Sequence, residues 1–307
     1  MKILNYSAEP VNKLFSWLPR DLEAEKVIFF PDACPGRSPL PTGTVVFTRQ
    51  QNWRKFAVSD CGCGMLLVKS TYCPKDFSKA TWDKIYYELR NKKGKLGDLG
   101  SGNHFLDALV TEGENYLYFL IHTGSRTESK IVDHLTDRPD EFDQKFGEVC
   151  SWAEANRLAI AQILENYFGP LETITDRNHN HFEKTNEGVI LRKGAVKIHP
   201  HELTVLPSNL IGDIVLVKAT QKVEATLFSL NHGTGRIMAR SEAKLHAEDY
   251  NYHKLREHIY IPEMISNASI KTEAPYCYRN LEDCLELIHE LITVEKRFKP
   301  IAYLGQI

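Results

Sequence analysis

The chain has 307 residues, of which 42% are hydrophobic and 25% charged, and its formal net charge at pH 7 is −2. This composition is typical of a soluble globular protein, and the near-neutral charge gives no global electrostatic case for a nucleic-acid binder. No apolar run approaches the roughly 18 residues of a membrane-spanning helix, and the first residues lack a signal-peptide core. Seven scattered cysteines do not suggest a disulfide framework, so we expect a cytoplasmic protein.

The N-terminal half alternates short apolar runs with amphipathic stretches. The runs at 26–30 and 43–47 suit buried strands, and helical periodicity predicts a helix at 78–91. A third apolar run, 116–121, predicts a strand that leads directly into a histidine. Apolar residues then recur at about 3.6-residue spacing over 144–168, which predicts a long helix ended by a Gly-Pro pair.

The C-terminal half continues this mixture. Strands are expected at 214–218 and 226–230, and the second leads into a glycine-rich loop at 231–236. A helix is expected to open at Arg236 and run to about residue 246, and a last helix is expected at 280–298. Strands and helices are mixed without a βαβ rhythm, and no repeat or flexible linker divides the chain. We therefore expect an α+β fold.

Residues 60–65 read Asp-Cys-Gly-Cys-Gly-Met and place two thiols and a carboxylate within four positions. The glycines let the backbone turn sharply, so soft sulfur and hard oxygen can face the same small volume. This composition is typical of a metal site, although two thiols alone fit a redox pair equally well. No second cysteine pair follows at zinc-finger spacing, so a structural zinc finger is not expected.

Four further loops place histidine among glycines or small polar residues. Taken singly, a lone buried histidine is more often a hydrogen-bonded core residue than a ligand. Together with residues 60–65, these loops offer five or six ligands, more than one tetrahedral ion uses. A two-metal centre with one shared ligand accounts for all of them, and such centres suit phosphoryl chemistry. The four loops are residues 100–105, 122–126, 178–181 and 231–236.

These segments, in this order, resemble the motifs of the RNA-splicing ligase RtcB family. The resemblance runs from about residue 30 to the C-terminus and implies an RtcB-like fold, with mixed or antiparallel β-sheets at the core flanked by helices, in one catalytic domain over residues 1–307. Residues 192–195 (Arg-Lys-Gly-Ala) match a further family signature. The five motifs are DxGCGM at 60–65, GxGNHF at 100–105, IHxGSR at 121–126, the pair His179-Asn180, and HGxGRxMxR at 232–240.

The resemblance implies a GTP- and Mn²⁺-dependent RNA ligase. It would join an RNA 2′,3′-cyclic phosphate or 3′-phosphate end to a 5′-hydroxyl end, in RNA repair or tRNA splicing. Carried over residue by residue, Cys63 would bridge two Mn²⁺ ions, with Zn²⁺ as an alternative occupant. Asp60 and His104 would complete the ligands of one ion, and His122 and His179 those of the other. Cys61 would then be a small filler with no assigned role.

The resemblance also implies that His232 is the nucleophile, attacking the α-phosphorus of GTP to form a histidine–GMP phosphoramidate. A nucleophilic imidazole must be neutral and free of metal, so one histidine of the set should stand apart from the others. His232 lies in a glycine loop of the kind that cradles phosphate, with Arg236 nearby. The residues expected at the nucleotide are Asn103, His104, Phe105, Leu106, Asp107, His179, Asn180, Ser208, His232, Gly233, Thr234 and Gly235.

The chain departs from the family pattern at several positions. Cys34 stands where the family's PDxHxG motif has histidine, and Asp107 stands where glutamate is common. Residues 207–212 differ from the usual phosphate loop, and residues 300–307 offer no counterpart of the family's terminal lysine. The nucleotide, GTP or another NTP, therefore stays open. Two other functions also stay open: a two-metal RNA phosphoesterase without nucleotidyl transfer, and a non-catalytic RNA-binding relative.

Overall fold

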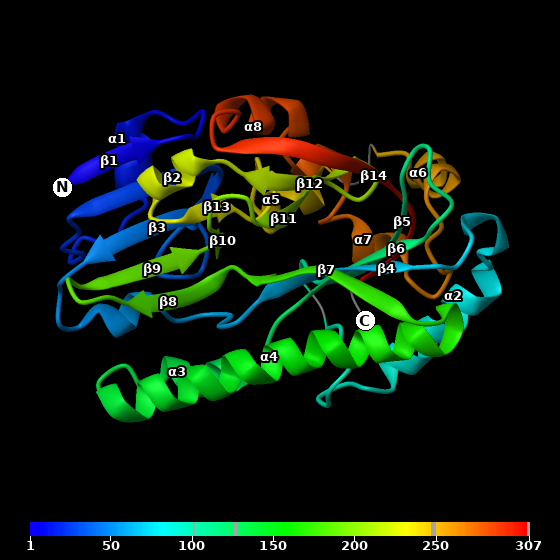
Figure 1. Ribbon diagram of the computed structural model, residues 1–307, viewed down its shortest axis with the longest axis horizontal. Coiled ribbons are helices and arrows are strands. Elements are labelled where there is room, and N and C mark those ends of the chain that lie inside the picture. Colours follow the sequence, from blue (N-terminus) through cyan, green and yellow to red (C-terminus); the bar gives the residue numbers. More distant parts are fainter. Residues whose placement is uncertain (101, 126–127, 247–249, 306–307) are drawn as a thin grey trace.

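The computed structural model describes residues 1–100, 102–125, 128–246 and 250–305. A five-stranded sheet, a seven-stranded sheet and a two-stranded ribbon form its framework, and helices flank them (Figure 1). Within the described ranges, one neighbouring strand pair is parallel, β1 with β2, and the other pairs are antiparallel. The expected α+β class with antiparallel sheets is confirmed.

The five-stranded sheet is buried on both faces. Alternate residues of its second strand pack into different cores: Val27 and Phe29 into one, Ile28 and Phe30 into the other. This period of two explains why residues 27–30 of the strand form a continuous apolar run. In spatial order the strands are β1 (Lys2–Asn5), β2 (Lys26–Cys34), β3 (Thr42–Thr48), β9 (Val189–Lys193) and β8 (Asn180–Lys184).

The seven-stranded sheet is also two-faced. Along β6, one of its inner strands, Phe119 and Ile121 face a core shared with helices, whereas Tyr118 and Leu120 face a core formed by strands of the same sheet. In spatial order the strands are β11 (Leu203–Pro207), β12 (Ile214–Ala219), β14 (Ile292–Gly305), β5 (Phe105–Val110), β6 (Tyr118–Thr123), β4 (Gly64–Ser70) and β7 (Leu171–Asn178). The ribbon pairs β10 (Ala195–Lys197) with β13 (Ser229–Asn231).

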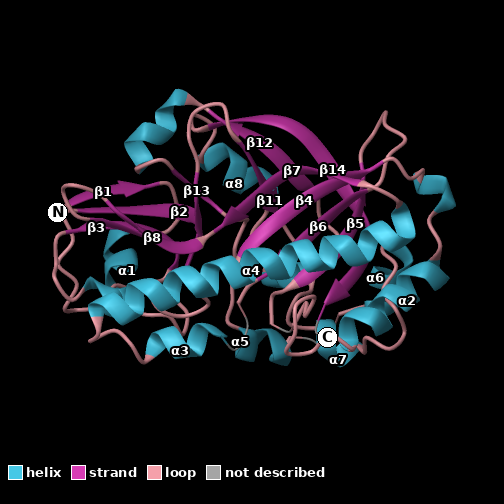
Figure 2. Ribbon diagram, turned by 60° about the horizontal axis from the view of Figure 1, so that its bottom comes forward, coloured by secondary structure: helices cyan, strands magenta, loops and turns pink. Residues whose placement is uncertain are grey.

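One long helix, α4 (Pro139–Phe168), spans both large sheets (Figures 1 and 2). Its first half buries Phe142 and Phe146 against the five-stranded sheet, and its second half buries Ile160 and Leu164 against the seven-stranded sheet. Acidic residues in its first turn complement the helix dipole. The helix therefore ties the two sheets together along one side.

The remaining helices are short and surround this framework. None of the helices in the described ranges is both long and apolar enough to cross a lipid bilayer. The α-helices are α1 (Val11–Ser16), α2 (Lys79–Arg90), α3 (Ser129–Asp133), α5 (Arg240–Leu245), α6 (Tyr252–His258), α7 (Asn267–Ile270) and α8 (Leu281–Leu287). Short 3₁₀ helices lie at η1 (Trp53–Phe56), η2 (Pro74–Asp76), η4 (Gln221–Thr226) and η6 (Pro275–Cys277).

Most of the expected elements are present. The strands expected at 26–30, 43–47 and 214–218 lie within β2, β3 and β12, and most of 116–121 lies in β6. The helices expected at 78–91 and 144–168 coincide with α2 and with most of α4. The predicted strand at 226–230 was wrong over its first half. Leu227 and Phe228 have φ values of +56° and +52°, so the chain turns there and β13 begins only afterwards.

Two predicted helices were also wrong in part. The last one ends at Leu287, and residues from Ile292 onward form β14, where the β-branched run 292–294 pairs with β12. The helix expected to open at Arg236 begins four residues later, because Arg236 forms a β-bridge with Tyr278. The glycine loop at 231–236 therefore does not open a helix.

Candidate metal and nucleotide site

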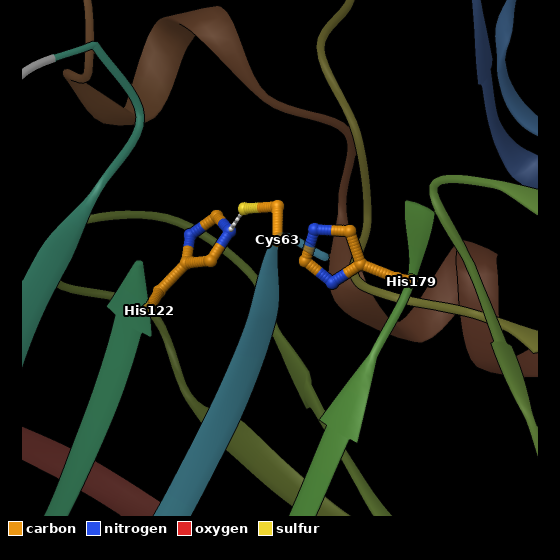
Figure 3. A group of neighbouring side chains, drawn as sticks. All are labelled: Cys63, His122 and His179. Carbon is orange, nitrogen blue, oxygen red and sulfur yellow. Dashed lines mark hydrogen bonds between the residues drawn. The ribbon is translucent and has the colours of Figure 1, made fainter. Parts of the chain in front are cut away.

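Cys63 lies at the centre of a buried group of side chains just before β4. Its Sγ is 3.4 Å from Nε2 of His104 and 3.4 Å from Nε2 of His122, the latter near the end of β6. His179, between β7 and β8, approaches the same sulfur from the opposite side (Figure 3). The antiparallel pairing of β4 with both β6 and β7 brings these strand ends together.

Among the described residues, two sets of three side chains could each hold a metal ion. One set is Cys63, His122 and His179, and the other is Asp60, Cys63 and His104. Within each set the candidate ligand atoms lie within 4.8 Å of one another, and Cys63 belongs to both. The structure thus brings together all five residues that the family resemblance assigned as ligands. They fall into the same two sets as expected, with Cys63 in both. Their role as metal ligands stays a prediction.

The neutral imidazoles of this cluster suit a cation, although its thiol must first lose a proton. Burial, with a smaller contribution from Asp60, raises the pKa of the Cys63 thiol well above its usual range. Burial and neighbouring histidines lower the pKa values of His122 and His179, which keeps both rings neutral. The Nδ1 atoms of these two rings are buried without a hydrogen-bond partner in the described ranges. A divalent cation would use the neutral imidazoles and displace the thiol proton, so the residues fit a metal centre.

The loop that precedes Cys63 has an unusual backbone. Ser59 and Asp60 have φ values of +77° and +56°, a region that non-glycine residues rarely adopt. Helix α3 supports this conformation, because the Asp60 N–H donates to Ser129 Oγ at 3.0 Å. The buried Lys193 donates to the Ser59 carbonyl at 2.6 Å. Strain of this kind persists only where the surroundings hold it, and it is common at functional sites.

His232 is held differently from the other histidines. Its Nδ1 is 2.6 Å from Asp32 Oδ2 and 2.9 Å from the Gly194 carbonyl. Both partners are acceptors, so Nδ1 carries the proton and the Nε2 lone pair is free. The ring centroid of His232 is 4.4 Å from that of His179, so the His232 ring lies beside the candidate metal cluster.

Asp32 is a site residue that the sequence analysis did not single out. It lies in β2, 200 positions before His232, and it is completely buried. In the sequence, the one indication of a role for Asp32 was its position in residues 31–36, which match the PDxHxG motif except that Cys34 replaces the histidine. Gly194, which follows β9, allows the close approach, because its φ is +65° and a Cβ there would lie 3.2 Å from His232 Nδ1.

The glycine loop after His232 lies against residues 207–212. The Thr234 N–H donates to the Pro207 carbonyl at 3.1 Å, and the Thr234 hydroxyl lies 3.3 Å from the Ser208 carbonyl. The Ser208 hydroxyl donates to the Asp213 carbonyl at 2.7 Å. Since the loop does not open a helix, the expected helix N-terminus at this loop was wrong, and the Thr234 N–H is engaged by Pro207; phosphate binding by the loop stays a prediction. Gly233 and Gly235 flank this contact.

The remaining predicted nucleotide residues lie on two sides of the cluster. Phe105 packs against His122, with ring centroids 5.2 Å apart, and Asn103 immediately precedes the metal candidate His104. Leu106 points the other way into the helix-side core, so only its backbone could reach a nucleotide. The Asn180 amide donates to the Asp60 carbonyl and accepts from the Gly194 N–H, which holds these two loops together. The parts of two motifs at Ser101 and Arg126 lie outside the described residues.

Asp107 is a buried carboxyl group on β5 whose Oδ1 has no hydrogen-bond partner in the described ranges. Burial raises its pKa well above the usual value of 3.8, so the folded protein retains a proton that the unfolded chain releases. Stability should therefore fall as the pH rises from about 4 toward the raised folded-state pKa, by up to about 1.4 kcal/mol per pH unit.

Asp107→Asn should abolish this pH dependence, because an amide of nearly the same shape does not ionise. We expect the variant to be more stable than the wild type at pH 8 and the difference to shrink toward pH 5, as measured by urea unfolding across this range. The exposed Asp137→Asn is the matched control and should follow the wild-type profile. Parallel profiles for Asp107→Asn and the wild type would contradict the assignment.

Comparison with known proteins supports the family resemblance. The family model described as tRNA-splicing ligase RtcB matches residues 136–306. RNA-splicing ligase RtcB2 of Escherichia coli is 25% identical over an alignment that covers 90% of this chain and 87% of that protein. The tRNA-splicing ligase RtcB of Nanoarchaeum equitans is 27% identical, with 68% of this chain and 59% of that protein covered. The RNA-splicing ligase RtcB of Mycobacterium tuberculosis is 23% identical, with 66% and 62% covered.

The chain therefore spans most of the length of one such relative and about six tenths of the other two. Because the family model covers more than half of its residues, this protein belongs to the RtcB family.

Proposed function

We propose that the protein is an RNA ligase that joins an RNA 3′-phosphate end, or a 2′,3′-cyclic phosphate end after it is opened, to a 5′-hydroxyl end. GTP is the proposed nucleotide and Mn²⁺ the proposed metal, with Zn²⁺ as an alternative occupant. Family membership supports the RNA ligase class. The observation that supports the chemistry best is His232, which is held by Asp32 through Nδ1 and lies next to a metal-type cluster.

The first step follows from the tautomer of His232. The free Nε2 attacks the α-phosphorus of the nucleotide, the new N–P bond forms, and the bond to the β-phosphate breaks so that pyrophosphate leaves. Asp32 retains the hydrogen bond from Nδ1 and stabilises the positive charge that the ring acquires, as the aspartate of a catalytic triad does. The ring then remains oriented toward the phosphorus.

Two transfers complete the reaction. An oxygen of the RNA 3′-phosphate attacks the phosphorus on His232, which transfers GMP and restores the Nε2 lone pair. The 5′-hydroxyl then attacks the activated 3′-phosphate, GMP leaves, and the hydroxyl proton goes to solvent. Divalent cations bound by Asp60, Cys63, His104, His122 and His179 would supply positive charge to neutralise the phosphate oxygens during these displacements.

The direct test is adduct formation. Incubation with MnCl₂ and each of the four NTPs in turn should give one covalent adduct, heavier by one nucleoside monophosphate, in an intact-mass spectrum. We expect the adduct with GTP; an adduct with another NTP alone would replace GTP in the proposal. Absence of an adduct with all four NTPs would refute nucleotidyl transfer. NTP-independent hydrolysis of RNA 2′,3′-cyclic ends would then favour the phosphoesterase alternative, and salt-sensitive RNA binding without turnover the non-catalytic one.

A further inference from the structure

The middle of α4 contains two adjacent polar residues that are fully enclosed. Asn156 is 0% exposed and Arg157 is 3% exposed, although the helix is otherwise apolar on this side. Buried polar groups are costly unless they are hydrogen-bonded, so their partners show what they hold in place. Within the part of the chain that the structure describes, the hydrogen-bond partners of these two side chains lie in segments that lead to or from a candidate metal ligand.

Arg157 contacts three of these segments. Its Nε donates to Asp176 Oδ1 at 2.7 Å, and this carboxylate lies three positions before His179. Its Nη1 donates to the Gly62 carbonyl at 3.2 Å, directly before Cys63, and approaches the Thr123 carbonyl at 3.5 Å, directly after His122. One planar guanidinium therefore links the start of β4 to the ends of β6 and β7 beside the cluster. The single ammonium group of lysine cannot make these contacts in the same geometry.

Asn156 contacts the fourth segment. Its Nδ2 donates to the Asp98 carbonyl at 2.9 Å, and its Oδ1 accepts from the Gly97 N–H at 2.7 Å. This stretch leads to His104 six positions later. The same Nδ2 lies 3.5 Å from the Gly124 carbonyl, which adds a second link to the end of β6.

The metal-ligand loop also rests directly on the helix. Gly62 has a φ of +72°, and a Cβ there would lie 2.9 Å from Cys150 Cα and 3.2 Å from Ala153 Cβ. Both residues precede Arg157 on the same face of α4, at helical spacings of seven and four. Helix α4 is thus in van der Waals contact with the loop at Gly62, and Arg157 of the same helix donates a hydrogen bond to this loop.

We propose that Asn156 and Arg157 act as a positioning pair that sets the affinity of the metal centre without ligating it. Together they contact all four ligand-bearing segments, three through backbone carbonyl groups and the fourth through the Asp176 carboxylate, so the spacing of the sulfur and imidazole ligands depends on one turn of α4. Outer residues that orient ligands in this way typically change metal affinity by about 10- to 100-fold when replaced. The inference rests on the proposed metal centre but not on the proposed ligase reaction.

The test is Co²⁺ binding to the folded full-length protein. Co²⁺ reports on thiolate ligation through its sulfur-to-metal charge-transfer absorption. We expect Arg157→Met to bind Co²⁺ about 10- to 100-fold more weakly than the wild type, with a weaker charge-transfer band, and Arg157→Lys to bind with intermediate affinity.

Arg54→Met is the matched control. Arg54 also pairs with a carboxylate on α4, donating to Asp143 at 3.0 and 2.8 Å, and is itself largely buried, but it lies away from the cluster. The control should lose stability without losing Co²⁺ affinity. If Arg157→Met and Arg157→Lys lower the melting temperature of the apo-protein but bind Co²⁺ as the wild type does, Arg157 is merely structural and the proposal is overturned.

If Arg157→Met does not fold, Asp176→Asn tests whether Arg157 positions the metal ligands. It keeps the shape of the Arg157 partner and removes its charge, so it should loosen the guanidinium and weaken Co²⁺ binding by a smaller factor than Arg157→Met. Wild-type Co²⁺ affinity in both Asp176→Asn and Arg157→Lys overturns the positioning role. A wild-type protein that binds neither Co²⁺ nor Mn²⁺ overturns the metal centre together with its positioning pair, whereas Co²⁺ binding without an NTP adduct removes only the ligase reaction.

Discussion

Replacing Cys63 with alanine should abolish metal binding and every metal-dependent reaction of the protein, whereas Cys61→Ala should leave both intact. The two thiols are two positions apart and both are buried, yet their surroundings differ. Cys63 Sγ lies among imidazole nitrogens and belongs to both candidate ligand sets. Cys61 packs in the core between the five-stranded sheet and α4, and its Sγ lies 3.8 Å from the Ala57 carbonyl.

The measurement is metal content after dialysis against Mn²⁺, together with adduct formation by intact mass. Cys61→Ala removes one buried sulfur, so it should lower the free energy of unfolding by about 1 kcal/mol with metal content unchanged. Cys63→Ala should fold, because its cavity is small, but should contain no metal. Loss of metal in both variants would show that residues 60–65 act as a thiol pair, and retention in Cys63→Ala would remove the shared ligand.

His232→Ala should abolish the NTP adduct completely, and Asp32→Asn should slow its formation by about 100- to 10,000-fold. The alanine variant has no nucleophile. The asparagine variant keeps the imidazole, but an amide N–H facing Nδ1 favours the tautomer that carries its proton on Nε2. The lone pair is then on the wrong nitrogen for most of the time.

The readout is the rate of adduct formation at saturating Mn²⁺ and GTP. The control is His253→Ala, since His253 is 89% exposed and pairs with Glu257 on its own helix. Metal content should be unchanged in both His232→Ala and Asp32→Asn, because neither residue belongs to the ligand sets. A wild-type adduct rate in Asp32→Asn would show that the Gly194 carbonyl alone orients the ring.

The sequence grouped the residues of the candidate ligand cluster because they lie in short motifs with unusual compositions. A cysteine and a carboxylate between glycines, and histidines at strand ends, remain recognisable without knowledge of the fold. Asp32 and Arg157 were missed for the opposite reason. A buried aspartate in a strand and an arginine in a long helix are ordinary in sequence, and only the packing of β2 and α4 shows what they contact.

The errors in secondary structure have similar physical causes. Ile288, Leu291 and Ile292 present apolar side chains at spacings that fit a continued helix, but residues 292–298 pair with β12 and form a strand instead. Leu227 and Phe228 adopt positive φ without glycine, which no local pattern reveals. Tertiary contacts therefore determined the structure in just those segments where local preference was weak.

The chain crosses from one large sheet to the other between β7 and β8. This crossing bears on whether metal binding can be lost separately from nucleotidyl transfer. β7 belongs to the seven-stranded sheet and β8 to the five-stranded sheet, with His179 at the crossing. Cys63 and His122 are anchored in the first sheet, and Asp32, which orients the nucleophile, in the second. The distance from the proposed cation sites to the proposed nucleophile is thus set by how one sheet is docked on the other. Substitutions in the inter-sheet contacts, far from any ligand, could leave a protein that binds its metals normally and yet no longer modifies its own histidine.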